Sequence, residues 1–200
     1  MSRYVFLFDL DSTITREEIF PSISKELGLT EKLRALAINN IWGELPYKQR
    51  FLQGVELFKE FPISEVCKKI GEIALNEKLA EFIRNNQDRC YIVTNILDVW
   101  LEELAAKLRM EHNLFCSKAL AKDGYIEEVF SIVDKNAVIS QMVLPFVAVG
   151  DGNNDAEMIE AAEIGIGYGG VHDIAPAVLA SASHVIYQED KLVEFLERLV

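Results

Sequence analysis

Four aspartates stand where carboxylates from distant parts of the chain could share one site. Asp9 and Asp11 follow a short apolar run near the start of the sequence, and Asp151 and Asp155 lie in a Gly-Asp-Gly-Asn-Asn-Asp block that follows another such run. Crowded carboxylates repel one another, so at least one pKa is raised. Mg²⁺ resolves this conflict, since it prefers oxygen ligands and commonly uses one or two carboxylates together with waters and a substrate phosphate. The sequence therefore predicts a Mg²⁺ site.

The spacing of Asp9 and Asp11 has a chemical use. If the chain stays extended, side chains two positions apart fall on the same side, so one carboxylate could attack phosphorus while the other gives a proton to the leaving oxygen. Taken alone, the pattern is better explained as a helix cap at residues 11–13. Residues 150–155 are a stronger signal, because their glycines allow a tight turn and a close approach of the backbone. Together the two motifs favour a reactive site over a turn and a cap.

These motifs follow apolar runs that are predicted to be strands. Short apolar runs bounded by polar residues are typical of strands buried on both faces, and their alternation with helical patterns predicts an α/β fold with a mainly parallel sheet. Ligands bind beyond the carboxyl ends of such strands, where Thr94 and Asn95 join the aspartates. The expected strands are residues 4–8, 90–93, 113–116, 145–149, 164–166 and 184–187, and the expected helices are residues 77–85, 98–109, 135–142, 155–162 and 191–199.

Two stretches interrupt this alternation. Residues 13–75 contain no convincing strand and show several amphipathic helical patterns, so they are predicted to be a helical insertion directly after the first strand. Residues 117–131 contain Asp123-Gly124 between apolar residues, which is a hairpin signal. We therefore expect one parallel core that carries a helical insertion and a hairpin.

Composition limits the kind of partner. The chain of 200 residues has 20 basic and 32 acidic side chains, a formal net charge of −12, and half of its residues are hydrophobic. This mix is typical of a soluble globular protein, and the acidic balance argues against a nucleic-acid partner. The longest apolar runs, such as residues 142–149, are too short to span a membrane. Cys67, Cys90 and Cys116 are widely spaced and odd in number, so we expect reduced thiols in a cytoplasmic protein. We further expect a monomer or a homodimer.

Four motifs together resemble the haloacid dehalogenase superfamily of phosphohydrolases, and most closely its phosphoserine phosphatase-like branch. The Asp-Leu-Asp-Ser-Thr run at residues 9–13 is similar to the family's first motif, Thr94 to the second, Lys135 to the third and residues 150–155 to the fourth. The motifs occur in the family's order and cover the chain from residue 4 to about 160. This combination is much more specific than any of its parts.

The resemblance implies both a fold and an activity. The fold would be a three-layer, Rossmann-like parallel core formed by residues 1–12 and 76–200, with residues 13–75 as a helical cap. The activity would be Mg²⁺-dependent hydrolysis of a small phosphorylated metabolite, a phosphomonoester, through an aspartyl-phosphate intermediate. Phosphoserine is one candidate substrate.

The same resemblance implies roles for the aspartates. Asp9 would be the nucleophile, and Asp11 would act first as general acid and then as general base. Mg²⁺ would be held by Asp9, by the backbone carbonyl of Asp11 and by Asp151, with Asp155 orienting these ligands. The division is physically reasonable, because the metal opposes the charge of the phosphoryl group.

Thr94 and Lys135 would bind phosphoryl oxygens, as the resemblance also implies. A lysine in this position opposes the charge of the phosphoryl group. The alternative for Lys135 is an ordinary solvated residue at the start of a helix, with Lys118 and Lys122 as competitors for the role.

Substrate recognition departs from that of the phosphoserine-specific relatives. Their cap glutamate, which pairs with the substrate amine, corresponds to Glu18, with Glu17 adjacent; the alternative is that both simply favour the first turn of a helix. Their cap arginine, which binds the substrate carboxylate, corresponds to Gly54, and Arg50 could compensate from a neighbouring helix face. Asn95 stands where those relatives have a glycine, and it adds a hydrogen-bonding group.

Three other functions stay open. Residues 165–170 match G-x-G-x-x-G, and Glu189 and Asp190 follow roughly 20 residues later, as in a dinucleotide site, although Pro176 interrupts the helix pattern that follows. A non-catalytic phospho-acceptor, similar to response-regulator receivers, would also gather carboxylates, a threonine and a lysine at one end of a parallel sheet. A phosphotransferase would share every motif described above.

The remaining candidate residues are assigned no catalytic role. His112, His172 and His184 lack the spacing of a zinc site, so they are interpreted as structural or solvated. Tyr47 and Phe20 are among the aromatic residues of the insertion that could line a pocket, but helix packing is their more common use.

Overall fold

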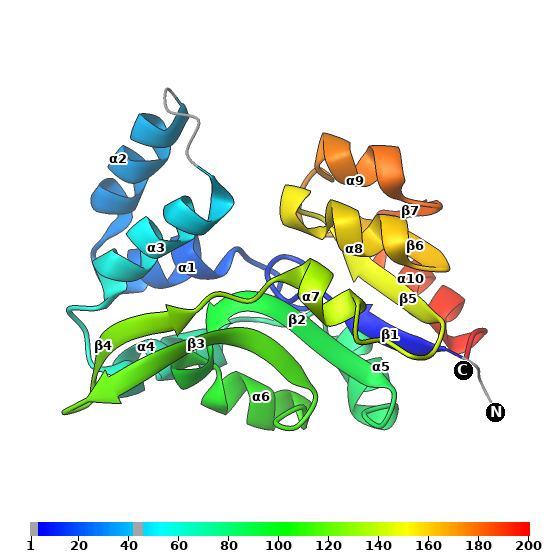
Figure 1. Ribbon diagram of the computed structural model, residues 1–200, viewed down its shortest axis with the longest axis horizontal. Coiled ribbons are helices and arrows are strands. Elements are labelled where there is room, and N and C mark those ends of the chain that lie inside the picture. The colour runs from blue at the N-terminus through cyan, green and yellow to red at the C-terminus, as the bar shows by residue number, and fades with distance from the viewer. Residues whose placement is uncertain (1–3, 42–45) are drawn as a thin grey trace.

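A mostly parallel sheet forms the centre of the computed structural model, which describes residues 4–41 and 46–200. In this part of the chain the sheet has seven strands in the order β4-β3-β2-β1-β5-β6-β7 (Figure 1). Neighbouring strands are parallel except for β3 and β4. The predicted α/β class is therefore confirmed. The strands are β1 (Val5–Phe8), β2 (Cys90–Leu97), β3 (Leu114–Lys122), β4 (Tyr125–Ser131), β5 (Phe146–Gly150), β6 (Ile164–Tyr168) and β7 (His184–Ile186).

The direction of strand order changes at β1. The strands β2 and β3 extend the sheet to one side of β1, whereas β5, β6 and β7 extend it to the other. A crevice forms beyond the carboxyl ends of the strands at such a point. Asp9 follows β1 and Asp151 follows β5, so the two motifs that were predicted to share a site lie at this crevice.

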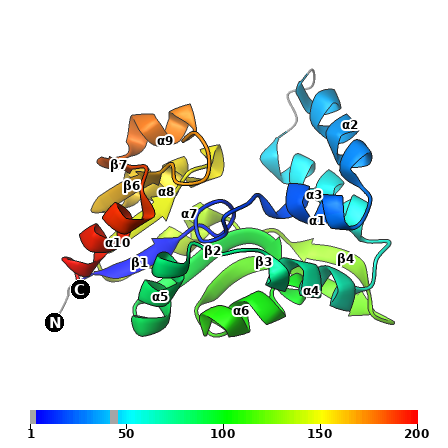
Figure 2. The ribbon, with the colours of Figure 1, turned by 180° about the vertical axis from the view of Figure 1, so that it is seen from behind.

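Helices cover both faces of the sheet, because successive side chains of a strand point to opposite faces. Phe6 and Phe8 are fully buried in one apolar cluster with residues of α5, α6 and α10, whereas Leu7 is fully buried in a second cluster with residues of α7, α8 and α9. Burial of one such side chain contributes about 1.5–3 kcal/mol. The expected three layers are thus present (Figures 1 and 2). These helices are α5 (Glu77–Asn85), α6 (Glu102–Leu108), α7 (Lys135–Ile139), α8 (Ala156–Ala161), α9 (Pro176–Ser181) and α10 (Glu189–Glu197).

Several predicted elements have different bounds in the structure, and two of them are consecutive in the chain. The strand expected at residues 90–93 continues to Leu97, with a shift in its register against β3. The helix expected at residues 98–109 begins as a short 3₁₀ turn, Asp98–Trp100, and continues as α6. The strand is longer because β3 itself continues past the core into the hairpin and offers β2 further pairing partners.

The insertion between β1 and β2 is helical, as predicted. It contains α1 (Ile19–Glu26), α2 (Thr30–Ile41), α3 (Tyr47–Phe58) and α4 (Ile63–Glu72). Figure 1 shows α1, α2 and α3 beside the sheet, whereas α4 lies behind β3 and β4, where it packs against α6. The two linkers of the insertion run together, because Thr15 and Leu75 form an antiparallel bridge. Within the described residues no helix has the length and the apolar character that a membrane crossing requires.

The predicted hairpin is confirmed. β3 and β4 are antiparallel and joined through Asp123 and Gly124, whose φ angles are +51° and +83°. Positive φ at both central residues is the signature of a type I′ turn, which explains the Asp-Gly pair. The carbonyl of Gly124 accepts a hydrogen bond from the backbone N–H of Ile63 at 2.8 Å, so the hairpin tip contacts the start of α4.

The acidic residues that follow the glycine-rich block at residues 165–170 attach one helix to another. Glu189 accepts a hydrogen bond from the backbone N–H of Lys78 at 2.7 Å, and Asp190 pairs with the ammonium group of Lys78 at 2.5 Å. Both contacts join the start of α10 to α5. The acidic pair that a dinucleotide site would require therefore serves this attachment.

Gly165→Ala is expected to lower the free energy of unfolding by about 1–3 kcal/mol. An added Cβ would lie 2.3 Å from the backbone carbonyl oxygen of Ile159, which cannot move aside without shifting α8. Gly167→Ala in the same strand is the matched control, because its Cβ would meet only side chains, at 3.1 Å or more. Urea denaturation followed by circular dichroism measures both variants. Equal losses of stability would contradict the steric argument.

Candidate active site

A cavity of about 220 Å³ lies where β1, β2 and β5 end. Core residues supply most of its wall, and the helical insertion supplies Glu18 and Tyr47. Core and insertion therefore form one cavity together. The residues that line it are Asp9, Asp11, Ser12, Glu18, Tyr47, Thr94, Asn95, Ile96, Asp151, Gly152, Asn154, Asp155 and His172.

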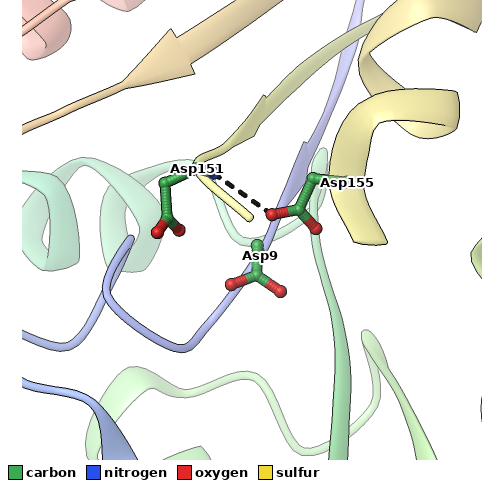
Figure 3. A group of neighbouring side chains, drawn as sticks. All are labelled: Asp9, Asp151 and Asp155. Carbon is green, nitrogen blue, oxygen red and sulfur yellow. Dashed lines mark hydrogen bonds between the residues drawn. The ribbon is translucent and has the colours of Figure 1, made fainter. Parts of the chain in front are cut away.

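Three of the predicted aspartates form a buried cluster. Carboxylate oxygens of Asp9, Asp151 and Asp155 lie within 4.8 Å of one another (Figure 3). Burial raises the pKa of Asp151 to about 7; the Asp155 carboxylate adds to the rise, and a hydrogen bond from Thr13 Oγ1 opposes it. Burial and the Asp155 carboxylate also raise the pKa of Asp9. This excess of negative charge on hard oxygen atoms fits a Mg²⁺ ion.

Asp155 holds the loop after β5. Its Oδ2 accepts hydrogen bonds from the backbone N–H groups of Asp151 and Gly152 at 3.1 and 2.9 Å, and its Oδ1 accepts one from Lys135 Nζ at 2.5 Å. A Cβ on Gly150 would lie 2.7 Å from this carboxylate, which explains the glycine. Because both oxygens of Asp155 are engaged with the chain, the residue is suited to orient the cluster.

Lys135 supplies a positive charge to the cluster. Its Nζ donates hydrogen bonds to Asp9 Oδ1 and Asp155 Oδ1, both at 2.5 Å, although its side chain is only 5% exposed. Burial lowers the pKa of Lys135, but the carboxylates of Asp155 and Asp9 outweigh this effect and raise it above its usual value. Asp134 caps α7 by accepting the backbone N–H of the second helical residue at 3.0 Å. The cap fixes the helix end from which Lys135 projects.

Asp11 connects the core with the insertion. Its Oδ1 accepts a hydrogen bond from the backbone N–H of Ile19, the first residue of α1, at 2.8 Å. Desolvation raises the pKa of Asp11 to about 8; the hydrogen bond from Ile19 opposes the rise, and the charges of Asp9 and Glu18 add to it. A raised pKa favours the protonated form of this carboxyl group, which is the form that a general acid requires.

Thr94 and Asn95 line the cavity from β2, and both are buried. The amide of Asn95 lies between the backbone carbonyl of Val133 and the side chain of Asn154, each at 3.4 Å. The register of β2 against β3 shifts in this stretch. Such irregularities redirect side chains next to active sites, so the strand presents these two residues to the cavity before it ends.

His172 is part of the cavity wall, so its interpretation as structural or solvated must be revised. Its Nε2 lies 2.8 Å from Ser12 Oγ and 3.3 Å from a carboxylate oxygen of Glu18, and its Nδ1 lies 3.5 Å from Asp151 Oδ2. Periodicity gave no indication of this position. The available signal was that His172 follows β6, whose carboxyl end lies at the same edge of the sheet.

Of the two predicted cap acids, Glu18 is the one at the cavity. The Glu17 carboxylate accepts a hydrogen bond from Ser22 Oγ at 2.7 Å. Tyr47, which packing arguments placed in a helix interface, also lines the cavity, from the first turn of α3. The insertion therefore presents one carboxylate and one phenol to the site.

The two positions considered for a cap cation lie outside this wall. Gly54 is packed against Phe20, and an added Cβ would lie 2.5 Å from that ring. Arg50 is exposed, with its guanidinium carbon 6.0 Å from the centre of the Tyr47 ring. Neither residue is among those that line the cavity.

The fold and the site define a class of protein. A parallel α/β sheet that presents an Asp-x-Asp pair, a buried lysine and a second acidic motif at one edge is arranged for phosphoryl transfer, which depends on positioning and charge. The chain belongs to the haloacid dehalogenase-like hydrolase family, whose sequence profile matches residues 6–160. It is an enzyme, a phosphoric monoester hydrolase, and the resemblance to the phosphoserine phosphatase-like branch is confirmed.

Similar proteins cover nearly the whole chain. The phosphoserine phosphatase of Methanocaldococcus jannaschii is 28% identical over 208 aligned positions, which cover 96% of each chain. That of Lactococcus lactis is 23% identical and covers 98% of this chain and 96% of its own. A solved structure of a phospho-aspartyl intermediate analogue of phosphoserine phosphatase is 27% identical, with a TM-score of 0.75 and 99% of both chains covered. A hydrolase of the family from Salmonella enterica serovar Typhi shares the fold, with a TM-score of 0.81 at 21% identity, over 96% of this chain and 70% of its own.

Proposed function

We propose that this enzyme is a Mg²⁺-dependent phosphatase that hydrolyses a small phosphomonoester through an aspartyl-phosphate on Asp9. The observation that carries the proposal is the unequal surroundings of two aspartates. Asp9 accepts a hydrogen bond from the charged Lys135 ammonium group at 2.5 Å, whereas Asp11 accepts one from the neutral backbone N–H of Ile19 at 2.8 Å. Carboxyl groups in opposed environments are suited to act as nucleophile and acid. The relatives named above support a small substrate, with phosphoserine as one candidate.

The proposed reaction has two steps. In the first, a carboxylate oxygen of Asp9 bonds to phosphorus as the bond from phosphorus to the leaving oxygen breaks, and Asp11 gives its proton to that oxygen. In the second, Asp11, now a carboxylate, takes a proton from a water whose oxygen attacks phosphorus, and the bond to Asp9 breaks. Lys135 and Thr94 hold phosphoryl oxygens throughout, so the charge is stabilised without rearrangement.

The proposed metal ligands are Asp9, Asp151 and the backbone carbonyl of Asp11, with Asp155 orienting them. Bound Mg²⁺ would supply the positive charge that lets a phosphate dianion approach this acidic site. Lys135 is the one ammonium group that contacts the cluster in the described part of the chain. The single positive charge of Lys135 does not neutralise the combined negative charge of the carboxylates and the incoming phosphate.

Removal of divalent metal is expected to lower the hydrolysis of p-nitrophenyl phosphate by about 100-fold or more, since several kcal/mol of charge stabilisation are lost. The measurement is phosphate release after dialysis against a chelator and then after addition of Mg²⁺. Protein dialysed without chelator is the control. Full activity in protein shown to be metal-free would contradict the proposal.

The products distinguish hydrolysis from its alternatives. Hydrolysis releases one inorganic phosphate for each alcohol, whereas a phosphotransferase would move the group to an added alcohol. A phospho-acceptor would keep a long-lived aspartyl-phosphate after the first turnover. A screen of phosphorylated metabolites with and without Mg²⁺ would test activity and substrate together.

The remaining proposals concern the whole chain. Residues 1–12 and 76–200 would form the catalytic core and residues 13–75 the cap, which the paired linkers at Thr15 and Leu75 support. The free and buried thiols support a cytoplasmic location. These thiols are Cys67, Cys90 and Cys116.

A further inference from the structure

The helical insertion adds negative charge to the cavity wall. Glu18 contributes a carboxylate and Tyr47 a phenol, and Ile96 of β2 adds an apolar side chain. Among the described residues that line the cavity there is no lysine or arginine. Besides the aspartates of the core, a leaving alcohol bound here therefore meets the Glu18 carboxylate, and the described lining residues offer it no guanidinium or ammonium group.

The Glu18 carboxylate is accessible to a bound molecule. Its side chain is 53% exposed, and its nearest recorded polar partner is His172 Nε2 at 3.3 Å. The adjacent Glu17 is engaged with Ser22. Glu18 is thus the cap acid that can accept a hydrogen bond or an ion pair from the alcohol part of the substrate.

Two cations of the cap, Lys48 and Arg50, have contacts outside this wall. Lys48 lies 3.7 Å from the carboxylate of Asp134, on the core. Arg50 is exposed, with its guanidinium carbon 6.0 Å from the centre of the Tyr47 ring. Gly54 is closed off by the Phe20 ring, so no side chain from that position can reach the cavity without displacing the ring.

We propose that the leaving alcohol of the substrate carries an ammonium group and no carboxylate, as in the phosphomonoesters of simple amino alcohols. The proposal rests on the phosphatase function proposed above and specifies its substrate class. An ammonium group pairs with Glu18. A carboxylate would face the carboxylates of Glu18 and Asp151, and the described residues that line the cavity include no lysine or arginine to pair with it. Like charges in contact are strongly unfavourable.

The experiment compares two substrates that differ only by the carboxylate, O-phosphoethanolamine and O-phospho-L-serine. With Mg²⁺ present, kcat/KM is expected to be about tenfold or more higher for O-phosphoethanolamine. Equal values, or a preference for O-phospho-L-serine, would overturn the proposal. Hydrolysis of p-nitrophenyl phosphate tests the phosphatase function separately from the substrate class. If this compound is hydrolysed and O-phosphoethanolamine is not preferred, only the proposed substrate class is wrong. If no phosphomonoester is hydrolysed, the proposed phosphatase function is wrong.

A pair of variants tests the role of Glu18. The measured quantity is the ratio of kcat/KM for O-phosphoethanolamine to that for 2-hydroxyethyl phosphate, which cancels differences in the amount of active protein. Glu18→Gln is expected to reduce this ratio by about fivefold or more, because the ion pair with the amine is lost. Glu17→Gln is the matched control and is expected to leave the ratio unchanged. An unchanged ratio in Glu18→Gln, or an equal fall in Glu17→Gln, would overturn the assignment of the amine to Glu18.

Discussion

Asparagine in place of Asp9 is expected to lower kcat/KM for phosphomonoesters by about 10⁴-fold or more, the scale seen when a catalytic nucleophile is removed. An amide oxygen is a poor nucleophile, so the bond between the enzyme and phosphorus does not form. Asparagine can still accept the hydrogen bond from Lys135, and the substitution removes one of the mutually repelling carboxylates. The variant is therefore expected to fold with an unfolding midpoint close to that of the parent protein.

Two measurements check this expectation. Steady-state phosphate release gives the loss of activity, and mass spectrometry of acid-quenched protein detects phosphate on the parent enzyme but not on Asp9→Asn. Asp88→Asn is the control, because Asp88 is exposed at the opposite end of the sheet, before β2 begins. Activity retained by pure Asp9→Asn protein would refute the assignment of the nucleophile.

Lys135→Met is expected to lower kcat by about 10²–10³-fold, the usual cost of removing one preorganised donor to a developing charge. It also leaves Asp9 and Asp155 without their shared cation. Loss of one partner from a buried ion pair costs about 3–5 kcal/mol of folding stability. Unlike the Asp9 substitution, this one is expected to reduce activity and stability together.

The matched control is Lys118→Met, which removes a lysine that the sequence alone could not exclude from the role. Lys118 pairs with Asp98 at 3.4 Å, and its side chain is 44% exposed, so its pair contributes about 1 kcal/mol or less. Phosphate release and urea denaturation of both variants give the comparison. A similar loss of activity in the two variants would contradict a specific contribution of Lys135 to catalysis.

Much of the site could be predicted from the sequence because its two aspartate motifs follow buried strands and Thr94 follows a buried apolar run. The apolar runs before Asp9, Thr94 and Asp151 fix where those side chains leave the sheet, and parallel strands bring their carboxyl ends to one edge. The hairpin could be predicted equally well, because the positive φ angles of its turn are local and explain the Asp123-Gly124 pair. These features depend on short-range patterns.

The residues that were missed depend on long-range contacts. His172 reaches the cavity because the loop after β6 turns back to the core, where Ala175 N–H donates to the Asp151 carbonyl at 2.8 Å. No periodic pattern in the sequence indicates that this loop turns back to the core. Tyr47 was misjudged for a related reason: an aromatic residue on a helix of the insertion has the same pattern whether it packs against another helix or faces a cavity.

The bond from the Ile19 N–H to Asp11 makes the proposed proton transfer dependent on the position of the insertion. The acid belongs to the core, but the group that aims its carboxyl belongs to the first turn of α1. In the function proposed above, a position of α1 without this contact would leave the Asp11 carboxyl group without the N–H that orients it. The insertion would then control the proton donor as well as access to the cavity.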